Sequence, residues 1–236
     1  MKQYHFLGVD IAGPKNTWVC ELIWDQEKLI LPYLPYIEGS LGKIVALVQK
    51  HNFVACAIDA PLSFSPSSIG GWRLSDKELR HLLPSPFKNI VVSQDALTAV
   101  TSRGMQLASL LRPFLGTLIE THPRASLVFL TQTEPALNKH VKTYKGKSPN
   151  PESQCLLWNF LTSGRFIKRV CGPKIRFKTL SFAQIERHPK LDGVIDALMC
   201  ALIAFLYIYR HSLLLKLPSE LDIRGYAPFY VISPSV

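Results

Sequence analysis

Three aspartates of this chain lie at positions where a carboxylate is costly or awkward. Asp10 lies inside an apolar run near the N-terminus, Asp59 ends a second apolar run, and Asp196 lies within a long apolar stretch. A carboxylate taken out of water is disfavoured by several kcal/mol unless it is paired, hydrogen-bonded or bound to a metal. Each of the three therefore needs a partner, and each is a candidate for a functional role.

Two further acids are candidates for the same site. Asp192 precedes Asp196 by four residues, so both carboxylates lie on one face of a helix. Glu120 ends another apolar run, at a sheet edge where ligands usually bind in open α/β sheets. Structural roles stay open beside the functional ones. Asp192 could cap the helix, Glu120 could be an ion-pair partner, and Asp59 could serve the turn at Ala60-Pro61.

Carboxylates that converge from distant strands and one helix suit a hard divalent cation. Mg²⁺ and Mn²⁺ take oxygen ligands, commonly from one or two carboxylates together with substrate phosphates and waters. Two such ions about 4 Å apart can activate water and steady the leaving oxygen in phosphodiester hydrolysis. We therefore expect Asp10, Asp59 and Asp196 to meet in space. The candidate metal ligands are Asp10, Asp59, Asp192 and Asp196, and the candidate catalytic residues are Asp10, Asp59, Asp196 and Glu120.

Other kinds of chemistry have less support. No serine lies in a GxSxG elbow, and none of the five cysteines lies beside an obvious histidine. The cysteines are scattered without a CxxC pair, which suggests neither a disulfide framework nor a zinc site. His122 shares a strand face with Glu120, although a histidine next to Pro123 is more often structural. The N-terminus does not have the pattern of a signal peptide, so a reducing cytoplasm is the expected location.

The composition predicts a folded, basic protein. Its 236 residues are 47% hydrophobic and 19% charged, which is enough apolar material for a sizeable core. A formal net charge of +10 favours a polyanionic partner such as nucleic acid. The most basic stretch, residues 139–151, is rich in Gly and Pro and is expected to be an irregular loop that contacts anions.

The hydrophobic pattern predicts the elements that position these residues. Three meander strands are followed by a helix, a strand buried on both faces and further helices, and this order indicates an α/β fold with a mixed sheet. The last helix has an uninterrupted apolar part of residues 198–209, too short for a bilayer span, so we expect no membrane. We predict a single domain over residues 1–236, with insertions near 60–95 and 131–180. The predicted strands are residues 6–11, 17–24, 28–34, 53–58 and 116–120. The predicted helices are residues 40–51, 75–83, 96–111, 124–130, 153–161 and 191–209. A second basic segment spans residues 165–178.

Six motifs in order resemble one protein family. The chain is similar to domain of unknown function family 429, regarded as a predicted nuclease branch of the ribonuclease H-like superfamily, which is related in fold to actin-like ATPases. The resemblance spans nearly the whole chain. It implies a ribonuclease H-like mixed sheet with helices on both faces and an acidic centre of Asp10, Asp59 and Asp196, with Asp192 and Glu120 as neighbours. The motifs are GVDIAG (8–13), AIDAPLSF (57–64), WRLSDKELR (72–80), IETHP (119–123), YKGKSPNPES (144–153) and DGVIDALMCALIA (192–204).

The leading functional hypothesis is a Mg²⁺- or Mn²⁺-dependent nuclease or phosphodiester hydrolase that acts on DNA or RNA. Its phosphate contacts would come from Arg80, Lys142, Lys145 and Lys147, because a carboxylate site repels a polyanion and needs basic flanks. Two alternatives remain. One is an actin-like or sugar-kinase-like nucleotide-binding enzyme, since Gly8 to Gly13 also resembles a phosphate turn. The other is a non-catalytic nucleic-acid-binding module with the same fold.

Overall fold

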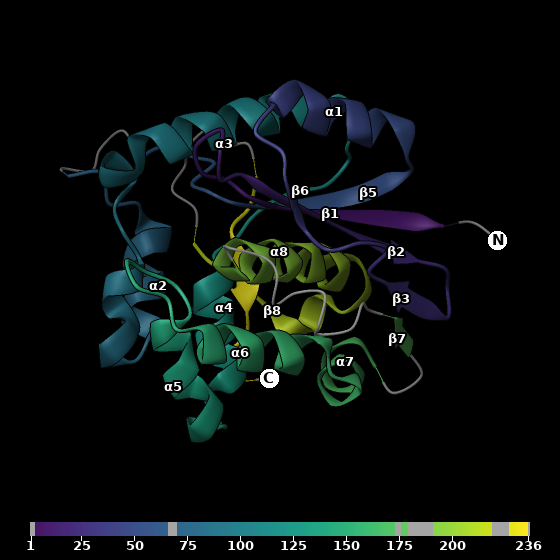
Figure 1. Ribbon diagram of the computed structural model, residues 1–236. Coiled ribbons are helices and arrows are strands. Elements are labelled where there is room, and N and C mark those ends of the chain that lie inside the picture. Colours follow the sequence, from purple (N-terminus) through teal and green to yellow (C-terminus); the bar gives the residue numbers. More distant parts are fainter. Residues whose placement is uncertain (1–2, 66–69, 173–175, 179–190, 219–226, 236) are drawn as a thin grey trace.

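A mixed seven-stranded sheet forms the centre of the protein and is flanked by helices (Figure 1). The computed structural model describes residues 3–65, 70–172, 176–178, 191–218 and 227–235. The sheet has the order β6-β5-β1-β2-β3-β7, with β4 paired to β2. The predicted α/β class with a mixed sheet is confirmed. The strands are β1 (Tyr4–Asp10), β2 (Trp18–Trp24), β3 (Lys28–Ile30), β4 (Tyr36–Ile37), β5 (Phe53–Asp59), β6 (Leu118–Glu120) and β7 (Arg176–Lys178).

The register of the central strands aligns the acids. Strand β1 is antiparallel to β2 and parallel to β5, and β5 is parallel to β6. In the parallel β1/β5 ladder Asp10 is the register partner of Asp59, and in the β5/β6 ladder Glu120 pairs with Ile58. The carboxyl ends of three parallel strands therefore carry Asp10, Asp59 and Glu120 to one edge of the sheet.

Helices cover both faces of the sheet (Figure 1). Helices α1 (Leu41–Lys50) and α3 (Thr98–Leu111) pack on one face, where Ile44 and Leu107 join a buried cluster with Leu7 and Val9 of β1. Helix α8 (Leu191–Tyr209) packs on the other face together with α4 (Pro123–Thr131) and α6 (Pro151–Thr162). The alternating side chains of β1 thus enter two separate cores, which explains why its sequence is a nearly continuous apolar run.

Helix α8 lies close against strands β1 and β2. A Cβ atom added at Gly8 would lie 2.2 Å from the Ala197 carbonyl oxygen, and one added at Gly193 would lie 2.2 Å from the Trp18 ring. Both glycines are therefore required for this approach, which places Asp196 against the end of β1. By length and composition α8 could cross a membrane, but 83% of its 18-residue apolar window is buried within the protein, as in a core helix.

The stretch 139–151 differs in part from the prediction that it is irregular. Helix α5 (Pro135–Thr143) covers its beginning, because Pro135 fits the first turn of a helix and Val141 is fully buried. Residues 144–150 are irregular as predicted. The basic segment 165–178 contains helix α7 (Gly164–Cys171) and strand β7, and the strand predicted at 28–34 ends at Ile30.

The remaining elements surround the acidic edge and the α8 face. A two-stranded sheet of β8 (Leu214–Lys216) and β9 (Tyr230–Ile232) packs near α4 and was not predicted. Residue Phe229, just before β9, forms an isolated bridge to Glu120. The other described elements are α2 (Leu74–Leu82), α4 (Pro123–Thr131), α6 (Pro151–Thr162) and the 3₁₀ helices η1 (Ser85–Ile90), η2 (Gln94–Leu97) and η4 (His211–Leu213).

Candidate functional site

Asp10, Asp59 and Asp196 meet at the carboxyl edge of the central strands. One carboxylate oxygen from each lies within 4.8 Å of the others. The convergence expected from the sequence is therefore present. The β1/β5 register sets Asp10 beside Asp59, and the close packing of α8 on Gly8 adds Asp196. Asp196 is fully buried and Asp10 is 8% exposed, whereas Asp59 is half-buried.

The environment of the site disfavours ionisation of Asp10 and Asp59. Burial raises the pKa of Asp10 well above its ordinary value, and the charges of Asp196 and Asp59 add to this effect. Burial and the Asp196 charge also raise the pKa of Asp59 to about 7, against the opposing effect of Lys145. A site in which neighbouring carboxylates resist ionisation gains stability from a bound cation.

Two residues of the α5–α6 connection hold Asp196. The Tyr144 hydroxyl donates a hydrogen bond to Asp196 Oδ1 at 2.7 Å, and Lys145 Nζ donates to Oδ2 at 2.5 Å. Burial lowers the pKa of Lys145, but the charges of Asp196, Asp10 and Asp59 raise it by more, so that its pKa lies well above the ordinary value. Lys145 is therefore a protonated internal cation among three acids, and its side chain is still 35% exposed.

The α5–α6 connection is itself anchored. Gln154 Nε2 donates to the Tyr144 carbonyl at 2.9 Å. Arg124, on α4, donates to the carbonyl oxygens of Val141 at 3.3 Å and Lys142 at 3.0 Å, and its guanidinium lies 5.8 Å from the centre of the Tyr144 ring. Tyr144 and Lys145 are thus fixed from two helices.

A cavity of about 650 Å³ opens over the acids. Asp192 contributes to its wall but does not belong to the 4.8 Å group, and it lies in the first turn of α8. Its carboxylate nevertheless raises the pKa of Asp10. The volume is in the range of small-ligand pockets. The basic residues in the wall are Arg73, Arg124, Lys145 and His122.

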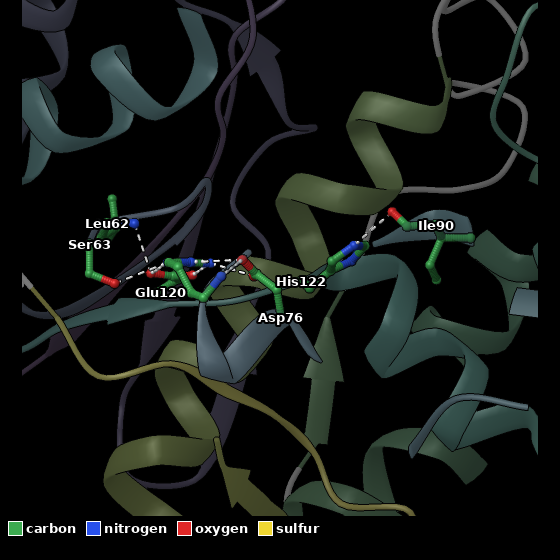
Figure 2. A network of polar contacts seen from close by, with 7 residues as sticks. Leu62, Ser63, Asp76, Ile90, Glu120 and His122 are labelled. Atoms are coloured by element: carbon green, nitrogen blue, oxygen red, sulfur yellow. Dashed lines mark hydrogen bonds and ion pairs between the residues drawn. The ribbon is translucent and has the colours of Figure 1, made fainter. Parts of the chain in front are cut away.

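Glu120 belongs to a buried ion-pair network that includes Asp76 (Figure 2). Arg73 bridges Glu120 at 2.6 Å and Asp76 at 2.7 Å, and Glu120 Oε2 also accepts from the Leu62 backbone N–H at 2.7 Å. Burial lowers the pKa of Arg73, but the Glu120 and Asp76 carboxylates raise it by more. Glu120 thus lines the cavity while its charge is neutralised by Arg73, which matches the ion-pair role left open by the sequence. Its catalytic role stays a prediction.

His122 has a structural contact on each ring nitrogen. Its Nδ1 accepts from the Ala125 N–H at 3.4 Å as the N-cap of α4, and its Nε2 lies 3.3 Å from the Ile90 carbonyl oxygen (Figure 2). Burial lowers the pKa of His122. The imidazole is therefore neutral at physiological pH and caps a helix at the cavity wall.

The four predicted phosphate contacts lie in different places. Lys145 is in the cavity and contacts Asp196, and Lys147 is exposed on the same connection. Lys142 is exposed, with its ammonium 5.6 Å from the centre of the Phe87 ring. Arg80 donates to the Val91 carbonyl at 3.0 Å and stacks 4.7 Å from the Trp72 ring centre. Their binding of phosphate stays a prediction.

Sequence reasoning missed the internal partners of the acids. Lys145 was expected to face a substrate phosphate, and Tyr144 and Arg73 received no role. The only sequence signal was that they fall inside the motifs 72–80 and 144–153. Contacts with Asp196 and Glu120 span about fifty residues of sequence, so no local pattern could reveal them.

Comparison with known proteins identifies one family. The family described as "Protein of unknown function (DUF429)" matches residues 8–210, which include all five candidate acids. Neither the curated proteins nor the solved structures give a match.

Proposed function

Because the chain belongs to the DUF429 family, whose description assigns no activity, we propose its function from the site: a divalent-metal-dependent nuclease or related phosphodiester hydrolase. The observation that carries this proposal is the group of Asp10, Asp59 and Asp196, with carboxylate oxygens within 4.8 Å of one another at a cavity of about 650 Å³. The proposal includes the ribonuclease H-like relationship that the sequence motifs imply.

The residues present fit Mg²⁺ or Mn²⁺. Their donors are carboxylate oxygens, which hard cations prefer, and the raised pKa values of Asp10 and Asp59 mean that a cation would relieve their repulsion. Asp10, Asp59 and Asp196 would hold the ion, and Asp192 in the cavity wall is the candidate ligand of a second ion or of its waters. When bound, such an ion polarises a phosphate and lowers the pKa of a water molecule.

The chain's own residues would position the substrate. Lys145 can exchange its contact with Asp196 for a phosphate oxygen, because its side chain is partly exposed in the cavity. Arg73 holds Glu120 and Asp76, and through Ser63 Oγ at 3.1 Å it fixes the loop that follows Asp59. This network keeps the cavity wall rigid, as a preorganised site requires. The net charge of +10 favours nucleic acid as the phosphodiester.

One observation favours a second candidate, a nucleic-acid-binding module without catalysis. Lys145 already contacts Asp196 Oδ2, so this oxygen has a cationic partner without a metal ion. If Lys145 stays in place when nucleic acid binds, the acids serve only to hold the lysine. The two candidates differ in whether Mn²⁺ binds and whether a phosphodiester bond is cleaved.

A cleavage assay on the wild type and matched variants distinguishes the nuclease from the binding module. We expect the wild type to cleave single-stranded or duplex DNA or RNA with Mn²⁺ and not with a chelator. Asp196→Asn should abolish this activity, because it removes a negative ligand at nearly constant volume. Glu27→Gln, an exposed acid in the β2–β3 turn, should leave it unchanged. Salt-sensitive binding of nucleic acid, with no cleavage in the presence of any divalent metal tested, would favour the binding module and contradict the nuclease.

A further inference from the structure

A second group of metal-ligating side chains lies at the opposite end of the sheet. Donor atoms of His5, Glu21 and His51 lie within 4.8 Å of one another. His5 is 8% exposed and Glu21 is 3% exposed, whereas His51 is exposed. His5 is the second residue of strand β1, which Asp10 ends, so at about 3.3 Å per residue the two groups are roughly 16 Å apart.

The fold brings these three residues together from three segments. In the β1/β2 ladder Glu21 pairs with Leu7, two residues beyond His5, so Glu21 and His5 point to the same face. His51 follows α1 directly, and the neighbouring Asn52 carbonyl accepts from the His5 N–H at 3.1 Å. The two imidazole rings stack with centroids 5.1 Å apart.

Glu21 is a buried carboxylate whose side-chain partners are His5 and Tyr33. Its Oε1 contacts His5 Nδ1, and its Oε2 accepts from the Tyr33 hydroxyl. Within the described part of the chain it makes no ion pair with lysine or arginine. This buried carboxylate therefore relies on an imidazole and a phenol hydroxyl, and a divalent ion in place of the proton shared with His5 would give it a full counter-charge.

We propose that His5, Glu21 and His51 bind Zn²⁺ or a divalent transition-metal ion of similar preference. Two imidazoles and one carboxylate are a donor set that suits zinc, whereas the all-oxygen group at Asp10 suits Mg²⁺ or Mn²⁺. The site uses no cysteine, so the cysteine pattern of the sequence gave no sign of it. The proposal does not depend on the nuclease activity.

Metal binding requires a local rearrangement of the three side chains. Tetrahedral zinc with bonds of about 2.0–2.1 Å places its donor atoms roughly 3.3 Å apart, so the direct His5 Nδ1–Glu21 Oε1 contact would have to open to admit the ion, while the group as a whole lies within 4.8 Å. His51 is exposed and can rotate inward. The ion replaces the proton between His5 Nδ1 and Glu21, and that proton leaves to solvent. A water molecule would complete the tetrahedral set, and the ion would link β1, β2 and the α1–β5 turn.

Zinc titration of the full chain tests this site. Metal-free protein is titrated with Zn²⁺ against a chromophoric chelator, with excess Mg²⁺ present to occupy the aspartate group. The variants are His51→Ala and, as a matched control, His81→Ala, an exposed histidine at the end of α2. We expect one zinc per chain in wild type and His81→Ala. His51→Ala removes a direct ligand, so its zinc affinity should fall at least as much as when an outer-shell partner is lost, which is roughly 10–100-fold.

Two further measurements keep the outcome clear. Co²⁺ should give the intense visible absorption of a four-coordinate, imidazole-bound ion in wild type, and His51→Ala should lose it while circular dichroism shows an intact fold. Asp10→Asn should retain the zinc. The proposal is wrong if wild type binds no zinc, if His51→Ala binds it like His81→Ala, or if Asp10→Asn is the variant that loses it.

Discussion

Lys145 balances the acidic site when no metal is bound. Its ammonium lies 2.5 Å from Asp196 Oδ2, and the charges of Asp10 and Asp59 also raise its pKa. One cation thus faces three carboxylates. A divalent ion would have to displace Lys145 or bind beside a like charge, so this lysine should set the metal affinity of the site.

We therefore predict that Lys145→Met tightens Mn²⁺ binding. The substitution removes a positive charge next to the ion, so the Kd for Mn²⁺ should fall about tenfold or more. A tenfold change corresponds to about 1.4 kcal/mol of binding free energy. The metal-free variant should be less stable than wild type, because its carboxylates lose their internal cation. Calorimetric titration measures both effects against Lys147→Met, an exposed lysine on the same connection. Equal affinity in the two variants would place the ion elsewhere.

The raised carboxyl pKa values predict a pH dependence. Asp59 has a pKa of about 7 in the folded protein against an ordinary value of 3.8, so the folded state binds its proton more tightly than the unfolded state. Metal-free stability should therefore fall as pH rises from about 4 to about 7. Mn²⁺ needs the ionised carboxylates, so its stabilising effect should grow over the same range.

Melting temperatures with and without Mn²⁺ across this pH range check that prediction. Asp59→Asn removes one titrating group and should reduce the fall in metal-free stability, while Glu27→Gln should follow wild type. A fall that is the same in wild type and Asp59→Asn would contradict the raised pKa of Asp59.

Helix α8 depends on its contact with strand β1. Gly8→Ala would place a Cβ 2.2 Å from the backbone of Ala197 and Ala201, which cannot move without shifting the helix. We predict a loss of stability of about 1–3 kcal/mol or more, and weaker Mn²⁺ binding because Asp196 shifts with the helix. Gly13→Ala is the control, since a Cβ there meets nothing within 4 Å. Denaturant unfolding that is equal for both variants would disprove the close packing.

Sequence patterns predicted the elements with long apolar runs. Strands β1 and β5 and helix α8 were found because their buried residues form continuous stretches, and the same runs made Asp10 and Asp196 conspicuous. Strands β8 and β9 were missed because three residues each carry too little periodicity. Helix α5 was obscured by the Gly- and Pro-rich composition that follows it. The Lys145–Asp196 pair is a tertiary contact that neither segment encodes locally.

For the molecule as a whole, the net charge of +10 predicts salt-sensitive binding of nucleic acid. The logarithm of the association constant should fall with the logarithm of salt concentration, with a slope near −0.9 for each duplex phosphate contact. If Lys142 and Lys147 each contact a phosphate, replacing both by alanine should reduce the slope by about 1.8. Fluorescence anisotropy over a salt series measures it, with Lys43 and Lys50 on α1 replaced as the control. Binding that does not change with salt would contradict the proposal.

The proposed function depends on a cation bound between the strands that end at one edge of the sheet and the helix that crosses them. A crystal structure of the protein soaked in Mn²⁺, recorded for anomalous scattering, tests this directly. We predict an anomalous peak with Asp10, Asp59 and Asp196 oxygens at about 2.0–2.3 Å, and Lys145 moved away from Asp196. A map with no peak between these three carboxylates, and with Lys145 still on Asp196, would contradict the account.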